Sequence, residues 1–151
     1  MHAIEELRYL ILAAQREGDR ALSAALNSLG LTTSQAEVLR VLHDYVSLSL
    51  IELGERLVCE TGSPSRLVNT LVEKQLVERS PSTTDRRMVK LSLTPSGRQL
   101  AEQVQAIEQN FYAQIEVLLK SAPIETINAA LWRFVDGRPA GKALSHRKDN
   151  P

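Results

Sequence analysis

Apolar residues recur every three or four positions from Ile4 to Leu29, and this spacing predicts an amphipathic helix at the start of the chain. Gly18 lies inside the segment and weakens a helix by about 1 kcal/mol relative to alanine, which leaves room for a bend there. Gly30 follows the last apolar position and is expected to end the helix in a left-handed conformation.

A second helix is predicted between residues 32 and 43, where apolar side chains again share one face. Its N-cap is one of three adjacent hydroxyl residues, Thr32, Thr33 or Ser34. Glu37 would supply the reciprocal acceptor of a capping box. The helix is expected to end near His43.

Two further helices joined by a tight turn are predicted next. Ser49 would cap the first, which is expected to run to about Cys59. Ser63 and Pro64 would start the second, which would end near Gln75. The helical period places four apolar residues of this second helix on one face, Leu67, Val68, Leu71 and Val72. Four polar residues fall on the opposite face, Arg66, Asn69, Thr70 and Glu73.

Two short β-like segments, residues 76–79 and 88–93, predict a hairpin, or wing, and the residues between them are rich in turn formers. The tip of this wing carries Asp85-Arg86-Arg87. A helix pair joined by a turn and followed by a basic hairpin suits a protein that reads double-stranded DNA through a groove and the backbone together.

Thr94 and Pro95 are expected to cap and start a long helix that continues to about Lys120. Its apolar residues form a narrow stripe typical of helix-to-helix packing: Leu100, Val104, Ile107, Phe111, Ile115 and Leu118. A helix of that length extends roughly 39 Å, more than a single small domain can cover. A last short amphipathic helix is predicted over residues 124–135, and residues 137–151 are expected to form a flexible tail.

The 151-residue chain has a net charge of zero, but its charge is segregated. Between Gly62 and Arg98 there are seven basic and three acidic residues, a net charge of +4 that the rest of the chain balances. A basic segment over the suspected reading head favours DNA as a partner. The single cysteine favours a reducing, cytoplasmic setting, and no apolar run is long enough to span a membrane.

The order and spacing of these segments resembles the MarR family of winged-helix transcriptional regulators. The resemblance rests on residues 31–39 (LTTSQAEVL), 65–71 (SRLVNTL), 85–87 (DRR) and 91–97 (LSLTPSG), and it covers nearly all of residues 4–135. It implies a mainly α fold with a small β-hairpin wing, a winged helix-turn-helix with N- and C-terminal dimerisation helices. It also implies a homodimeric repressor of a pseudo-palindromic operator, released by a small aromatic or anionic ligand or by oxidation. Such a regulator would work in the cytoplasm of a bacterium or archaeon, in association with the nucleoid.

The resemblance divides the chain into dimerisation helices at residues 4–30 and 95–136 and a DNA-binding lobe at residues 31–94. We expect an interface above about 2,000 Å². It would be formed by Ile4, Leu7, Ile11, Leu100, Val104, Ile107 and Phe111. One position departs from the family, which usually has glycine where this chain has Gln75. A left-handed conformation at Gln75 would cost on the order of 1 kcal/mol. Either Gln75 adopts this conformation despite the cost, or the turn into the wing has a different shape.

Arg66 and Asn69 are the candidates to read bases. Arginine can bind guanine O6 and N7 at two points, and asparagine can do the same with adenine N6 and N7. Ser63, Ser65 and Thr70 are expected to contact phosphates, helped by the partial positive charge at the helix amino end. The alternative interpretation is that these polar side chains only form a solvated face.

Arg86 and Arg87 are the candidates for the wing contact, because a narrow minor groove concentrates negative potential that attracts arginine. Asp85 would orient one of the two arginines through a charge-assisted bond. The alternative is a solvated turn with an incidental ion pair.

Two other functions stay open. The fold could serve as a protein–protein interaction module or anti-repressor, which would bind no duplex tightly. The chain could also be a redox-sensing regulator through Cys59, but the adjacent Glu60 disfavours the thiolate and no second cysteine can resolve an oxidised form.

Catalysis is not expected, because the chain lacks a phosphate-cradling loop and a nucleophile elbow. His2, His43 and His146 have no partners at metal-ligand spacing, so neither a metal nor a cofactor is expected. In the family architecture an effector pocket could be lined by Tyr9, Arg16, His43, Phe111 and Tyr112. Because aromatic residues on helices more often fill cores, we assign no ligand-binding residue.

Overall fold

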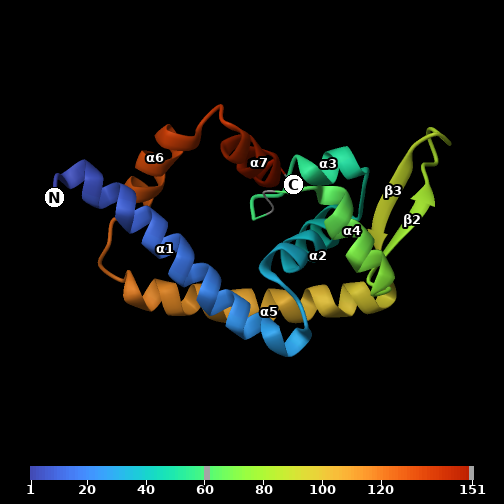
Figure 1. Ribbon diagram of the computed structural model, residues 1–151, viewed down its shortest axis with the longest axis horizontal. Helices are drawn as coiled ribbons and strands as arrows, with labels where there is room; N and C mark the ends of the chain where they lie inside the picture. Colours follow the sequence, from blue (N-terminus) through green and yellow to red (C-terminus); the bar gives the residue numbers. More distant parts are fainter. Residues whose placement is uncertain (60–61, 150–151) are drawn as a thin grey trace.

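The computed structural model describes residues 1–59 and 62–149 (Figure 1). It is mainly helical with a small antiparallel sheet, as the sequence predicts. The elements in chain order are α1 (Ala3–Leu26), the 3-10 turn η1 (Asn27–Leu29), α2 (Thr33–Tyr45), β1 (Ser47–Leu48), α3 (Leu50–Gly54), α4 (Pro64–Glu73), β2 (Val77–Pro81), β3 (Val89–Leu93), α5 (Pro95–Leu118), α6 (Ile124–Val135) and α7 (Pro139–Lys148).

The first helix is continuous through Gly18, which does not break it. It ends through η1 and Gly30, which has the expected left-handed conformation with φ of 66°. The amide of Gly30 donates to the carbonyl of Asn27 at 3.1 Å. This stop turns the chain from α1 into α2, and Figure 1 shows α1 crossing the long helix α5.

The caps of α2 and α3 are both capping boxes, but the expected acceptor in α2 was wrong. Thr32 is the N-cap, and its reciprocal partner is Gln35, whose Oε1 accepts from the Thr32 amide at 3.1 Å. Glu37 lies two residues farther along the helix and turns into the protein, where it is buried. Ser49 caps α3 as predicted, with Glu52 as its partner.

Both helices of the pair begin as predicted but end earlier than expected. α3 ends at Gly54 instead of near Cys59, and α4 ends at Glu73. Gln75 then adopts the left-handed conformation, with φ of 59°. The amide of Leu76 donates to the carbonyl of Leu71 at 3.0 Å, which closes the end of α4. The turn therefore has the left-handed conformation that a glycine would adopt. The Gln75 side chain makes this conformation less favourable by a modest conformational free energy.

The wing is a sheet of three strands in the order β1-β3-β2. Residues from Val77 to Pro81 on β2 pair antiparallel with those from Leu93 to Val89 on β3. Strand β1 has only two residues, pairs with β3 opposite Ser92 and Leu91, and was not predicted. A two-residue strand carries too little alternation to be seen in a sequence.

The described residues divide into parts that differ in burial. The winged lobe comprises α2, α3, α4, the sheet and α5 up to Val104, and its core is formed by side chains such as Val38, Leu39, Leu42, Leu53 and Leu71. The helical arm comprises α1, the rest of α5 and α6. Leu26 is the only fully buried residue of α1, and α6 has none.

The expected flexible tail was wrong, because residues 139–148 form helix α7. Gly141 permits α7 to pack against the end of α6, since a Cβ there would lie 2.1 Å from the carbonyl oxygen of Val135. Ala143 is buried, and Figure 1 shows α7 turned back beside α3. The segment was misread because glycine, proline and lysine resemble a tail in composition, whereas its helix is stabilised by tertiary contacts.

Candidate nucleic-acid interface

Helix α4 has the two faces that the sequence predicts. Val68 and Leu71 are buried in the core of the winged lobe, whereas Arg66 and Asn69 are exposed. Thr70 is half-buried, and its hydroxyl donates to the carbonyl of Arg66 at 3.2 Å. The apolar face therefore fixes the helix on the lobe and leaves Arg66 and Asn69 on its exposed side.

The amino end of α4 carries two of the predicted phosphate contacts. Ser63 is the N-cap by position, but no side chain caps the helix there. Instead, the hydroxyls of Ser63 and Ser65 lie 2.8 Å apart and share a hydrogen bond. Both serines are exposed at the helix terminus that favours anions.

The tip of the wing is a turn held by its own backbone and hydroxyl groups. The amide of Ser82 donates to the carbonyl of Met88 at 2.8 Å, and the amide of Met88 donates to the carbonyl of Asp85 at 3.0 Å. The side chain of Ser82 is turned inward, where the amide of Asp85 donates to its hydroxyl. The tip is therefore a defined turn that presents residues 86 and 87 outward.

Asp85 bonds to the wing differently from the expectation. Its Oδ1 accepts a hydrogen bond from the backbone amide of Arg87 at 2.9 Å, where an arginine side chain was expected. Both Arg86 and Arg87 are exposed, and within residues 1–59 and 62–149 neither guanidinium has a carboxylate within 4.0 Å. Asp85 thus shapes the backbone of the tip and leaves both guanidinium groups unpaired.

Strand β3 of the wing is tied to α3 by an ion pair. Lys90 Nζ lies 2.9 Å from Glu52 Oε2. The backbone amide of Ser49 and the nearby Lys90 lower the pKa of Glu52 to about 2. The side chain is partly exposed to solvent, so the pair orients the wing more than it stabilises the fold.

One residue of this surface was missed by the sequence analysis. Arg79 on β2 donates from Nη2 to Oδ1 of Asn69 on α4, and so joins the wing to the recognition helix. Its position two residues after the buried Val77 was the available signal, because alternate residues of a strand share a face.

Glu37 positions the loop that leads into α4. Its carboxylate accepts hydrogen bonds from the backbone amides of Val58 and Cys59, both at 2.8 Å. The side chain is only 4% exposed, and Arg147 of α7 donates to it at 2.9 Å. A buried carboxylate with three donors is well satisfied, so this cluster holds the loop and α7 together.

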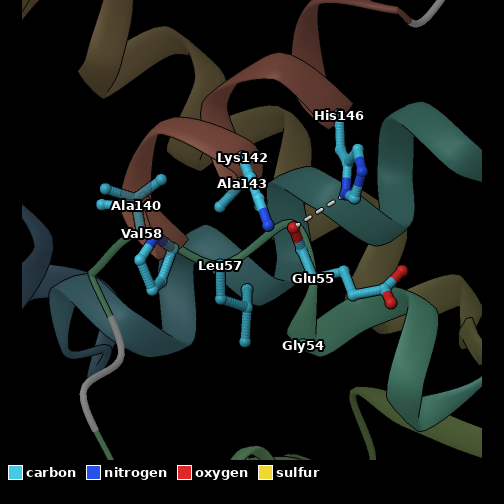
Figure 2. Close-up of a pocket in the computed structure, with 9 residues that line it drawn as sticks. Gly54, Glu55, Leu57, Val58, Ala140, Lys142, Ala143 and His146 are labelled. Carbon is cyan, nitrogen blue, oxygen red and sulfur yellow. Dashed lines mark hydrogen bonds between the residues drawn. The ribbon is translucent and has the colours of Figure 1, made fainter. Parts of the chain in front are cut away.

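Two further bonds hold α7 on the lobe. The Tyr45 hydroxyl donates to the carbonyl of His146 at 2.6 Å, and His146 Nδ1 lies 3.2 Å from the carbonyl oxygen of Glu55 (Figure 2). Between α7 and α3 lies a cavity of about 540 Å³, lined on the α7 side by Ala140, Lys142, Ala143 and His146. Helix α7 is therefore attached beside α3 and does not fill all the space there.

The helical arm exposes three of the seven apolar residues predicted for dimerisation. Ile4, Leu7 and Ile11 are 66%, 50% and 40% exposed along α1. A cavity of about 820 Å³ separates this stripe from Phe134 of α6, which is itself 69% exposed. Surface of this kind is typical of helices that pack against another chain.

The prediction that Val104 contributes to an interface between chains was wrong. Val104 is 0% exposed within the single chain, because this part of α5 packs against α2 in the core of the winged lobe. Leu100 and Ile107 pack partly against the same core, and Phe111 is half-buried. One continuous stripe on α5 thus begins in the lobe's own core and continues into the arm.

Comparison with known proteins identifies the family of this arrangement. A model described as the MarR family matches residues 31–89. The chain is 29% identical over 123 residues to the multiple antibiotic resistance protein MarR of Escherichia coli strain K12, covering 81% of this chain and 85% of that protein. The crystal structure of a mutant E. coli MarR complexed with operator DNA superposes with a TM-score of 0.77 at 28% identity, covering 87% of this chain and 95% of that chain. The chain belongs to the MarR family.

Other relatives of this MarR-family chain carry related descriptions. An organic hydroperoxide resistance transcriptional regulator of Bacillus subtilis strain 168 is 29% identical over 97 residues, 64% of this chain and 66% of that protein. An organohalide-sensing transcriptional regulator, crystallised in its 2,4-dichlorophenol-bound form, shares the fold with a TM-score of 0.78 at 18% identity, covering 92% of this chain and 83% of that chain. The relatives are named as transcriptional regulators, a non-enzymatic function, so this MarR-family chain is a transcriptional regulator and not an enzyme.

Cys59 lies in an environment that disfavours its thiolate. Loss of solvent around the sulfur, and then the charge of Glu37, raise the pKa of the Cys59 thiol to about 11, although part of the residue is exposed. Oxidation by peroxide requires the thiolate, so this environment opposes redox sensing. Glu60, on which the sequence analysis relied, lies outside the described residues.

The other candidate chemistry of this MarR-family chain is sparse. Within the described ranges no group of three His, Cys, Asp or Glu residues could hold a metal ion, and no helix there is long and apolar enough to cross a membrane. His43 lies 3.5 Å from Asp44, and the rings of Phe111 and Tyr112 pack at 6.0 Å.

Proposed function

We propose that the chain is a homodimeric repressor that binds a pseudo-palindromic operator and is released by a small aromatic or anionic ligand. The observation that carries this proposal is the exposed face of α4, with Arg66 and Asn69, next to a wing that carries the unpaired Arg86 and Arg87. A major-groove helix beside a cationic wing matches the docking geometry of helix-turn-helix proteins.

Each residue of this surface then has a role that its position supports. Arg66 and Asn69 would contact base edges, while Ser63, Ser65 and Thr70 would bind phosphates near the amino end of α4. Arg86 and Arg87 would enter or flank the minor groove, and Asp85 would hold the wing tip in shape through the Arg87 amide.

The exposed apolar surface of the helical arm supports a homodimer. Ile4, Leu7 and Ile11 on α1 and Phe134 on α6 remain 40% to 69% exposed in the single chain. A second copy would bury this surface and hold two copies of α4 about 34 Å apart, the spacing of successive major grooves. Residues 4–30 and 95–136 would thus form the dimerisation helices.

Release by a ligand is supported by the family. One solved structure that shares the fold is the dichlorophenol-bound regulator. Another is Bordetella bronchiseptica BpsR, whose DNA binding is regulated by 6-hydroxynicotinic acid. We propose that this chain responds to a small compound of similar size. A regulator of this type would act in the cytoplasm of a bacterium or archaeon, at the nucleoid.

Selection of duplexes from a random pool, at moderate salt and with the purified full chain, tests DNA binding directly. We expect a pseudo-palindromic sequence, and analytical ultracentrifugation should give two chains per duplex. Candidate small aromatic acids are then titrated against that complex. A chain that selects no duplex would favour the interaction module instead.

The salt dependence of binding tests the wing. The variant Arg86→Ala with Arg87→Ala should bind the selected duplex more weakly, and each lost phosphate contact should lower the slope of log affinity against log salt by about 0.9. The matched control is Arg20→Ala with Lys142→Ala, which removes two positive charges from α1 and α7. A slope unchanged from wild type would contradict contact between the wing and phosphate.

A further inference from the structure

One side-chain hydrogen bond joins the recognition helix to the wing at the exposed head. Arg79 Nη2 donates to Oδ1 of Asn69, across from β2 to α4. Both residues are exposed, so the bond lies on the surface proposed to meet DNA. It determines which atoms of Asn69 remain available to a base.

Arg79 is supported along its length before it reaches Asn69. It shares a strand face with the buried Val77, which packs in the core of the lobe. Together with Leu50, Ser65 and Val68, it lines a small cavity between α3, α4 and the sheet. An arginine whose aliphatic stem lies along apolar surface keeps its charged head at the edge of that surface, here beside α4.

The two-point contact of asparagine with adenine needs both ends of the carboxamide. The oxygen must accept from adenine N6 while the nitrogen donates to N7. In this chain the oxygen is engaged by Arg79, whose remaining N–H groups are also donors. An adenine amino group that approached the same oxygen would meet a guanidinium donor and positive charge. The two side-chain N–H groups of Asn69 have no hydrogen-bond partner among the described residues.

We propose that Arg79 is a positioning residue that turns Asn69 into a donor-only reader of DNA. Asn69 then favours guanine, whose O6 and N7 are both acceptors, or the O4 acceptor of thymine, over adenine, whose N6 amino group is a donor. Arg79 sets this preference because it holds the carboxamide oxygen toward the wing. The inference rests on the proposed function, since it specifies which base the α4 surface reads.

The test compares base preference in four variants of the full-length protein on the duplex that the wild type selects. The position read by Asn69 is the one at which Asn69→Ala loses discrimination. There the wild type should prefer guanine or thymine over adenine by about 10-fold, the range of one good two-point contact. Arg79→Met frees the oxygen and should raise adenine to at least equal affinity. Arg79→Lys keeps a donor and should keep the wild-type preference.

A double variant separates positioning from a direct contact of Arg79 with DNA. If Arg79 acts through Asn69, Arg79→Met with Asn69→Ala should show the flat preference of Asn69→Ala alone at that position. Arg20→Met, which removes the same charge from α1, is the matched control and should leave base preference unchanged. Circular dichroism should confirm that all variants are folded.

Three results would overturn the inference. The first is a wild-type preference for adenine at the Asn69-dependent position. The second is an Arg79→Met variant that loses affinity equally for all four bases there, which would make Arg79 a phosphate contact. The third is failure of the wild type to discriminate among any duplexes, which would overturn the proposed function itself. This outcome is distinguishable from the other two because it is measured on the wild type alone.

Discussion

The winged lobe and the helical arm differ in how they treat apolar residues at the same helical spacing. In the lobe, Leu39, Leu42 and Leu71 are 0% exposed within the single chain. In the arm, Ile4 on α1, Leu118 on α5 and Phe134 on α6 are 66%, 82% and 69% exposed. The lobe is complete as a single chain, whereas the arm has an apolar surface and lacks a cover for it.

Helix α5 shows where one region passes into the other. Its stripe begins with Val104 in the core of the lobe and continues through the half-buried Phe111 to the exposed Leu118. The same pattern of spacing therefore serves two interfaces, one within the chain and one that we propose lies between chains. A rigid helix shared by both would fix the positions of the two reading heads relative to the dimer axis.

The largest expected effect comes from removing the proposed cover of the arm. The variant Ile4→Ser, Leu7→Ser and Ile11→Ser should shift the protein from dimer to monomer, because each fully buried apolar side chain contributes about 1.5–3 kcal/mol. Analytical ultracentrifugation measures the shift, and affinity for the selected duplex should fall with it. Glu17→Ser with Arg20→Ser, on exposed polar positions of α1, is the control. A wild type that is monomeric at every concentration would contradict the proposal that a second chain covers the apolar surface of the arm.

A core substitution in the lobe should have the next largest effect. Leu39→Ala should lower the free energy of unfolding by about 2–5 kcal/mol, because it leaves a cavity among fully buried side chains. Urea unfolding followed by circular dichroism measures the change. Met88→Ala, on the exposed wing, should change it by less than about 0.5 kcal/mol. Similar losses in the two variants would mean that the lobe core is not packed as described.

The cluster at Glu37 tests how the lobe is linked to the C-terminal helix. Glu37→Gln replaces one of the two acceptor oxygens with an N–H donor, which then faces a backbone amide or Arg147. Because two donors cannot form a hydrogen bond, the free energy of unfolding should fall by about 1–3 kcal/mol. Duplex affinity should also fall, because the loop into α4 loses its anchor. Glu55→Gln, an exposed carboxylate on the neighbouring turn, is the control. Lost stability with unchanged duplex affinity would argue against a positioning role for Glu37.

The smallest expected effect concerns the pH dependence of the ion pair between Glu52 of α3 and Lys90 of β3. The pKa of Glu52 is about 2 in the folded chain, below its ordinary value of 4.5, so its contribution to stability is present above pH 4.5 and is lost as the pH falls toward 2. Glu52→Gln should flatten this part of the acid unfolding curve, by less than about 1 kcal/mol because the pair is partly exposed. Urea midpoints at pH 3 and pH 6 measure the difference, with Glu78→Gln as the control. Equal flattening in Glu52→Gln and Glu78→Gln would mean that the pH dependence does not come from the pair of Glu52 with Lys90.

Much of the lobe was predictable because its signals are local. Thr32 and Ser49 cap helices, Thr94 caps α5, and Gly30 adopts a left-handed turn as expected. The polar face of α4 followed from a 3.6-residue period, since Val68 and Leu71 had to be buried. Each of these depends on neighbours within a few positions, so no partner in space had to be known.

The parts that were missed depend on residues far apart in the sequence. Glu37 was read as a cap acceptor, but it binds amides 21 and 22 residues away and Arg147, 110 residues away. Helix α7 looked like a tail because its composition is polar, and its order comes from contacts with Tyr45 and Glu55. Arg79 was overlooked because its partner Asn69 lies on another element.

The sequence alone therefore determined the order of the helices from α1 to α6 and of the wing hairpin, the N-cap residues of α2, α3 and α5, and the two faces of the recognition helix. It could do so because hydrophobic period and capping chemistry act over one or two turns. The tertiary structure decided which apolar residues are buried within the chain, where the buried carboxylate finds its donors, and which atoms of Asn69 remain free. Burial and hydrogen bonding between distant elements are set by how those elements pack, and a linear pattern does not contain that information.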